Sequence, residues 1–350
     1  MLVPLAGGGQ ETLLSEVGFV LLPLFTTRDA CRLRLVCREF LAAVTEQPWE
    51  DARTVIKGSV AAWRACFPRA RAANVSQRAP WVEGRATPVV DADFVHLQGL
   101  RALVMQRCES VTDGAFVHLR GIHTLDMSGL GGQAGITDAA FAHLRGIHTL
   151  DMSGCWKDSI TDAAFAHLRG VHTLSMAYCS QAGVSDAAFA HLRGVHTLDM
   201  SGCRQRGITD GAFVHLRGIH TLNMRECSQA GITDAAFVHL RGIHKLNIRH
   251  CTQDNITDAA FAHLRGIHSL DMSGCRQRAI TDAAFEHLRG IHMLSMRGCN
   301  QEGITDAAFA HLRGIHTLVM KGCNQEGITD AAFAHLRGIH TLNISKCFAF

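Results

Sequence analysis

The sequence predicts an α/β solenoid that follows a small all-α unit. A segment of about 24 residues returns eleven times between residues 89 and 350, and each copy joins a period-two apolar pattern to a capped amphipathic one. Residues 13–52 lack this repeat and carry three helical patterns instead. One strand and one helix in so short a segment cannot bury an apolar face alone, so the copies are expected to stack and share a core.

The repeat is marked by the phenylalanine of an AF-x-HLRG string. Successive phenylalanines are 22 and 25 residues apart at first, and then 24 residues apart eight times over. They are Phe94, Phe116, Phe141, Phe165, Phe189, Phe213, Phe237, Phe261, Phe285, Phe309 and Phe333. The near identity of the copies indicates tandem duplication.

The first half of each repeat is predicted to be a short strand. Within Ile147–Cys155, Leu150 and Met152 point to one face and Thr149 and Asp151 to the other. Each strand is expected to start near the IHTL string and to end before the cysteine.

The second half is predicted to be a helix of two to three turns. Within 160–170, Thr161 or Asp162 is a suitable N-cap, an apolar stripe faces inward, and the final glycine ends the helix. The side chains expected in the core are Leu150, Met152, Cys155, Ile160, Phe165 and Leu168, with their equivalents in the other repeats.

The repeat resembles a known type. Its strand half reads L-x-x-L-x-L-x-x-C and is followed by Ile-Thr-Asp, as in the cysteine-containing leucine-rich repeat, over about three quarters of the chain. About two extra residues separate Cys203 from Ile208, which should only lengthen a turn. The resemblance implies a right-handed horseshoe with parallel strands on the concave side and helices on the convex side.

Residues 13–52 resemble an F-box. The resemblance is carried by Glu16, Val17, Phe19, Leu21 and Leu22, by the string from Arg28 to Phe40, and by Trp49. The expected helices are Leu14–Leu24, Arg28–Leu33 and Leu35–Thr45. Leu13-Leu14 replaces the usual Leu-Pro opening and Pro23 comes late, so the edge of the surface departs from the family pattern. A helical cap on the end of the solenoid is the alternative interpretation.

The remaining segments complete the predicted organisation. Residues 1–12 are expected to be a flexible tail, and residues 53–88 a linker with a degenerate capping repeat. Ala70, Ala73 and Val75 fit the three apolar positions of a first strand, which would cover the open edge of the sheet. Leucine-rich repeats then occupy residues 89–350.

The repeats argue against an enzyme, a cofactor and a metal site. Candidate Asp, His and Ser residues recur around the arc, whereas catalysis needs one constellation that does not repeat. The cysteines form a column of parallel thiols, unlike converging zinc ligands, and Leu130 takes one place in it. Of the 22 histidines, 21 fall in two columns, typified by His143 and His148. Charging such a column should be costly, because neighbouring strands lie about 5 Å apart.

An F-box before leucine-rich repeats implies the substrate-recognition subunit of an SCF-type cullin–RING ubiquitin ligase. Such a subunit is not catalytic: it binds a Skp-type adaptor, which links it to a cullin, and it presents a protein substrate. The side chains expected to bind the adaptor are Val17, Phe19, Leu21, Leu33, Leu35 and Phe40. A scaffold or inhibitor solenoid without ubiquitin transfer is the alternative.

The substrate is expected on the concave wall, where the repeats diverge. Two outward columns are acidic early and basic late, so the predicted partner-binding residues are Asp151, Asp199, Arg225, Arg249, Arg297 and Lys321. Neutral drift is the alternative explanation. A nucleic-acid ligand on Arg204, Arg206, Arg225, Arg249, Arg276, Arg278 and Arg297 is disfavoured, because residues 91–350 hold 23 basic and 23 acidic side chains.

The expected location is the cytoplasm or the nucleus. The chain opens without a secretory signal pattern, lacks an apolar run of roughly 20 residues, and its 13 cysteines suit a reducing compartment. We expect a protein that is not bound to a membrane and is monomeric outside its complex. Near-uniform repeats behind an F-box also resemble repeat families of giant DNA viruses, which would place the protein in a host cell.

Overall fold

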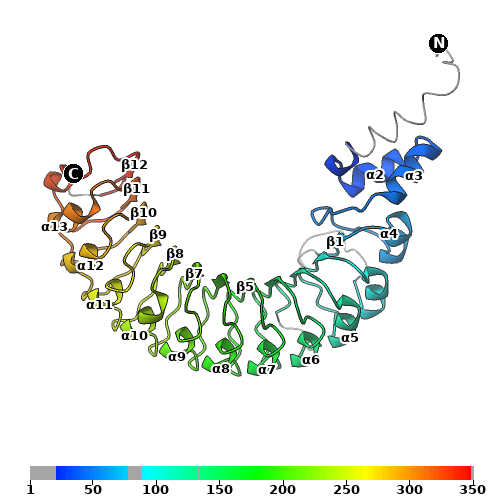
Figure 1. Ribbon diagram of the computed structural model, residues 1–350, viewed down its shortest axis with the longest axis horizontal. Coiled ribbons are helices and arrows are strands. Elements are labelled where there is room, and N and C mark those ends of the chain that lie inside the picture. Colours follow the sequence, from blue (N-terminus) through cyan, green and yellow to red (C-terminus); the bar gives the residue numbers. More distant parts are fainter. Residues whose placement is uncertain (1–20, 78–87, 132–134, 348–350) are drawn as a thin grey trace, which may run out of the picture.

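The chain forms a horseshoe with strands along its inner wall and helices along its outer wall (Figure 1). The computed structural model describes residues 21–77, 88–131 and 135–347. The N-terminal helices lie at one tip of the arc and the last repeat at the other. The predicted α/β solenoid is confirmed for the described residues.

One parallel sheet of twelve strands lines the inner wall in chain order. The strands are β1 (Ala72–Asn74), β2 (Ala102–Val104), β3 (Thr124–Asp126), β4 (Thr149–Asp151), β5 (Thr173–Ser175), β6 (Thr197–Asp199), β7 (Thr221–Asn223), β8 (Lys245–Asn247), β9 (Ser269–Asp271), β10 (Met293–Ser295), β11 (Thr317–Val319) and β12 (Thr341–Asn343). Equivalent residues lie side by side, as Leu150 of β4 does with Leu174 of β5. The degenerate first strand is confirmed, because β1 pairs with β2 and Ala70, Ala73 and Val75 are buried.

The outer helices are much shorter than predicted. They are α5 (Asp113–Phe116), α6 (Asp138–Phe141), α7 (Asp162–Phe165), α8 (Asp186–Phe189), α9 (Asp210–Phe213), α10 (Asp234–Phe237), α11 (Asp258–Phe261), α12 (Asp282–Glu286), α13 (Asp306–Phe309) and α14 (Asp330–Phe333). The first repeat has the 3₁₀ helix η2 (Asp91–Leu97), and three others continue into η3 (Val117–Leu119), η4 (Val238–Leu240) and η5 (Ala310–Leu312). The expectation of two to three turns was wrong. The chain must turn back to the sheet at the HLRG glycine, and Gly170 does so with φ of 82°.

The helix starts follow the predicted capping residues. The Thr161 side chain accepts a hydrogen bond from Ala163 N at 3.3 Å, so Thr161 is the N-cap. Asp162 has a further role that the sequence did not reveal. Its carboxylate accepts from the backbone N–H and the hydroxyl of Ser185 in the next repeat, at 2.8 and 2.6 Å. The same bridge joins neighbouring repeats from Asp91 to Thr329.

The core is one continuous row of apolar columns. Leu150, Met152, Cys155, Ile160, Phe165 and Leu168 are buried as predicted, and so are most of their equivalents. The last repeat is the exception: Leu342 is 37% exposed, and Phe333 and Cys347 are only partly buried. No further repeat among the described residues packs on them.

The N-terminal part contains η1 (Leu22–Leu24), α2 (Thr27–Leu33), α3 (Arg38–Glu46) and α4 (Val60–Cys66). The second predicted helix is confirmed within one residue. The third begins at Arg38 rather than at Leu35, because Leu35 and Val36 lie in the turn and Cys37 is extended. Most of the first predicted helix lies outside the described residues, and its described end is only η1.

Trp49 joins this part to the solenoid. Its ring is buried, lies edge-on to Phe67 at 5.7 Å, and donates to Val44 O at 2.8 Å. Its carbonyl accepts from the N–H groups of Arg71 and Ala72 at 2.7 and 3.1 Å, where β1 begins. The helices therefore share one core with the repeats.

Candidate functional site

The candidate partner-binding residues lie at the C-terminal ends of the strands. Asp151 and Asp199 are the last residues of β4 and β6. The basic candidates were predicted on the strands, but they lie two residues beyond strand ends, in the following turn. These residues are Arg225, Arg249, Arg297 and Lys321. The acidic and basic candidates come from different repeats, and within the described chain no ion pair joins them.

The acidic column shapes the turn. Asp151 Oδ1 accepts from Ser153 N at 2.9 Å, and Asp199 Oδ1 accepts from Ser201 N at 2.8 Å. Such a bond from a side chain to the backbone two residues on stabilises a tight turn. Asn223 does the same for Arg225 N at 3.2 Å. The carboxylates therefore have a structural task in addition to any contact with a partner.

The last residue of each strand and the residue two positions later vary together among the repeats. Serine follows aspartate where the column is acidic, in the pairs Asp126–Ser128, Asp151–Ser153, Asp199–Ser201 and Asp271–Ser273. Each basic residue follows an uncharged one, in the pairs Asn223–Arg225, Asn247–Arg249, Ser295–Arg297 and Val319–Lys321. Asparagine keeps the turn hydrogen bond and removes the negative charge beside the arginine. The later turns consequently present basic side chains that their own strands do not neutralise.

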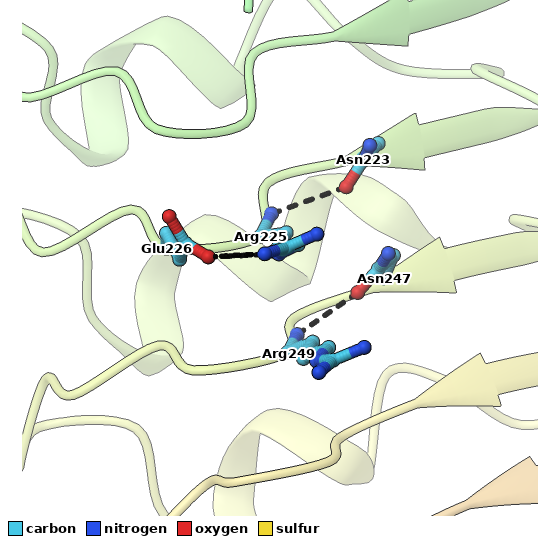
Figure 2. Close-up of polar contacts among 5 residues, drawn as sticks. All are labelled: Asn223, Arg225, Glu226, Asn247 and Arg249. Atoms are coloured by element: carbon cyan, nitrogen blue, oxygen red, sulfur yellow. Dashed lines mark hydrogen bonds and ion pairs between the residues drawn. The ribbon is translucent and has the colours of Figure 1, made fainter. Parts of the chain in front are cut away.

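Arg225 and Arg249 lie side by side on neighbouring turns (Figure 2). The Glu226 carboxylate accepts from Arg225 Nε at 2.9 Å and from a terminal nitrogen at 2.5 Å, which raises the pKa of Arg225. Arg249 has no acidic partner within the described part of the chain, and its Nε is buried without a hydrogen bond there. Glu226 was not anticipated from the sequence, although its place among glycines in the repeat alignment could have revealed it.

The predicted adaptor-binding residues divide into three groups. Val17 and Phe19 lie outside the described residues. Leu33 and Phe40 are partly buried, and Leu33 packs against the core. Leu21 and Leu35 are exposed, and Leu35 is 87% exposed. Further exposed apolar side chains surround them in sequence: Leu24, Phe25, Val36 and Leu41.

The thiols of the cysteine column are poorly suited to react. The thiols donate to backbone carbonyls of the preceding repeat, mostly those of methionines, as Cys203 Sγ does to Met176 O at 3.2 Å; Cys108 and Cys275 donate to Val75 O and Ile248 O instead. Burial raises the pKa of Cys203 to about 12, and the same cause acts on Cys108 and Cys251. Leu130 is buried in the same column, as expected of a packing position.

The histidines form two ordered columns, one just after the helices and one directly before the strands. Ten imidazoles from His123 to His340 stack with ring centroids 4.4–4.6 Å apart. In the other column, an arginine donates to the Nδ1 atom of the next repeat's histidine, as Arg145 does to His167 at 3.3 Å. Within the described residues no three His, Cys, Asp or Glu side chains come together as metal ligands.

Comparison with known proteins identifies the fold. No family model matches the chain, and no curated protein matches its sequence. Solved structures do match. A TLR13 complex with single-stranded RNA aligns with a TM-score of 0.58 at 17% identity, over 80% of this chain and 44% of the other. An internalin of Listeria monocytogenes gives 0.55 at 16% identity, over 71% and 69%.

A third match is the mouse RP105/MD-1 complex, with a TM-score of 0.57 at 14% identity, over 82% of this chain and 52% of the other. The chain thus spans about half the length of the TLR13 and RP105 chains. The likeness shows that the protein is a leucine-rich-repeat solenoid. In the described residues, no helix combines the length and the apolar character needed to cross a membrane.

Proposed function

We propose that the protein is the non-catalytic substrate-recognition subunit of an SCF-type ubiquitin ligase. Residues 13–52 would bind a Skp-type adaptor, and the adaptor would link the chain to a cullin. The concave side would hold a protein substrate. The protein would act in the cytoplasm or the nucleus. If the protein is viral, these are the compartments of a host cell.

One observation carries the adaptor proposal. Leu24, Leu35 and Val36 are 78%, 87% and 66% exposed, although Ala30 of α2 and Val44 of α3 are buried. A surface with several exposed large apolar side chains, beside apolar residues that are already packed in the core, is suited to bind another protein. This unit also resembles an F-box in sequence. The alternative, a plain capping unit, leaves these exposed side chains without a task.

The substrate proposal follows from the fold. The concave wall offers two divergent columns of polar and charged side chains on a framework whose core columns hardly vary. The solenoid in the RP105/MD-1 structure is in complex with another protein. A scaffold or inhibitor that binds a protein without ubiquitin transfer is the second candidate, and it shares this surface.

Adaptor binding tests the proposal. The purified full chain is titrated with a purified Skp-type adaptor in a calorimeter, and we expect one-to-one binding. Leu35→Asp should abolish binding, because a charge placed in an apolar interface without a partner costs several kcal/mol. Leu35 is exposed, so the variant should fold with the circular dichroism spectrum of the wild type.

The matched control is Val117→Asp, which alters an exposed apolar side chain of the repeats. It should leave adaptor binding unchanged. If the wild type does not bind the adaptor, or if Leu35→Asp binds it fully, the ligase proposal fails and the scaffold candidate takes its place.

A further inference from the structure

One position in every repeat holds the backbone in the left-handed region. It directly precedes the residue of the cysteine column, which is Leu130 in one repeat, and in six repeats it is a glycine: Gly129, Gly154, Gly202, Gly274, Gly298 and Gly322. In the other five it is Arg107, Tyr178, Glu226, His250 or Lys346, with φ of 55–65°. A residue with a Cβ is strained in this conformation. Neighbouring copies show that glycine is available to the repeat, so the five exceptions call for a reason.

Three exceptions lie near Arg225 and Arg249 along the chain. Tyr178, Glu226 and His250 belong to the stretch in which Arg225 and Arg249 replace serine. Tyr178 is the only tyrosine of the chain, and His250 is the one histidine outside the two columns. Rare residue types are thus concentrated at strained positions beside the same pair of arginines.

The strained rings lie across the next repeat. A Cβ on Gly202 would collide with the Tyr178 ring, and one on Gly274 would collide with the His250 ring. Each ring therefore rests on a bare glycine, and Tyr178 remains 51% exposed. Gly202, on which the Tyr178 ring lies, donates its N–H to Arg225 O at 2.7 Å, so the ring and Arg225 belong to a run of three consecutive turns.

We propose that Tyr178, Arg225, Glu226, Arg249 and His250 form one binding site, the turn patch, for an acidic peptide segment of a protein partner. The proposal rests on the function proposed above and names the chemistry of its substrate. Arg249 has no acidic partner in the described chain and can bind a carboxylate with two parallel hydrogen bonds. Glu226 fixes the neighbouring guanidinium of Arg225 in place. The Tyr178 ring offers an apolar face to an adjacent side chain of the peptide.

The surrounding charges favour a short acidic peptide over a nucleic acid. Arg297 and Lys321 extend the basic surface beyond the turn patch, but Asp199 and Asp271 lie at strand ends beside it. A polymer with a charge on every backbone unit would meet these carboxylates. A peptide can place its few acidic side chains on the arginines alone.

The test replaces residues of the turn patch with the residues found at the equivalent positions of other repeats. The probe is a fluorescein-labelled decapeptide with two glutamates and one phenylalanine among glycines and serines, and its affinity for the full chain is measured by fluorescence anisotropy. Arg225→Ser with Arg249→Ser should weaken binding about tenfold or more, as loss of charged contacts does. Tyr178→Gly and His250→Gly should each weaken it about threefold or more. Both glycine variants should also unfold at a higher temperature, since the strain is removed.

A higher unfolding temperature together with weaker peptide binding distinguishes a binding role from a structural one. Arg107→Gly and Lys346→Gly are the matched controls, and they should gain stability with unchanged affinity. Patch variants that bind like the wild type would overturn the proposal, as would tighter binding of poly(U) RNA that the same variants lose. The adaptor titration is run on the same preparations. Its failure would remove the ligase assignment and leave the peptide result standing.

Discussion

At the residue scale, single polar side chains hold each repeat to the next. Asp210 begins α9 and accepts from both the N–H and the hydroxyl of Thr233 at 2.7 Å. Its negative charge therefore stabilises the positive end of its own helix, and its oxygen satisfies the backbone N–H of Thr233 at the start of the next helix. One carboxylate does both tasks, which accounts for the Thr-Asp pair in nearly every repeat.

Asp210→Ala tests this bridge. The variant leaves the Thr233 N–H without its partner, so we expect the free energy of unfolding to fall by about 1–3 kcal/mol. Urea unfolding followed by circular dichroism measures the change. Asp330→Ala is the control, because no following repeat in the described chain bonds to Asp330, and only the helix-end effect of about 0.3–1 kcal/mol is lost. Equal losses at both positions would rule out the bridge as a source of stability.

At the element scale, the two histidine columns join neighbouring repeats. Burial lowers the pKa of His196, and the neighbouring imidazoles of His220 and His172 lower it further. On the other column, burial and the Arg217 guanidinium lower the pKa of His239. Burial likewise lowers the pKa of His123, His244 and His316 in the first column and of His263 in the second.

Acid is expected to loosen the solenoid. A histidine with a lowered pKa in the folded state contributes stability that is complete above its unfolded pKa of about 6.5 and is lost as the pH falls through the folded value. The midpoint of thermal unfolding should thus be constant from pH 8 to 7 and should fall between pH 6.5 and 5. His196→Gln combined with His220→Gln and His244→Gln should flatten this fall. A midpoint that does not change between pH 8 and 5 would disprove the coupling.

The sequence predicts the elements unevenly. Strand position and the Leu150, Met152 and Cys155 columns follow from a strict period of two, which is a local property. The length of α7 does not follow from a local pattern. The chain returns to the sheet and ends the helix before the apolar pattern ends. The turn bonds of Asp151 and the bridge of Asp162 depend on neighbouring repeats, so sequence patterns assigned these carboxylates only a surface charge and a helix cap.

The basic candidates show the same limit. Arg225 and Arg249 were correctly singled out as divergent, but their place beyond the strand ends depends on where β7 and β8 stop. Their link to Tyr178 and His250 depends on left-handed backbone that only coordinates reveal. In the N-terminal helices, exposure of Leu35 could be expected of a binding residue, whereas the burial of Leu33 depends on how α2 packs.

At the scale of the whole molecule, two separate surfaces share one rigid frame. The N-terminal helices lie at one tip of the arc, and the strands follow its inner wall (Figure 1). Exposed apolar side chains belong to the first part and the charged candidates to the strand ends. Trp49 and Phe67 connect the helices to the first strand through a continuous core. Because every repeat packs on its neighbours, a partner on the arc would be held at a fixed position relative to a partner at the tip.

The central claim is that the concave side binds a protein. Affinity capture of the full chain from cells, quantified by mass spectrometry, tests it when the wild type is compared with Arg225→Glu, Arg249→Glu and Arg297→Glu combined. The control combines Arg169→Glu, Arg193→Glu and Arg217→Glu on the histidine-bonded helical side. The concave variant should lose at least one protein that the wild type and the control both enrich, while all three keep the Skp-type adaptor. Equal capture of every protein by the concave variant and the wild type, with losses confined to the control, would contradict the account.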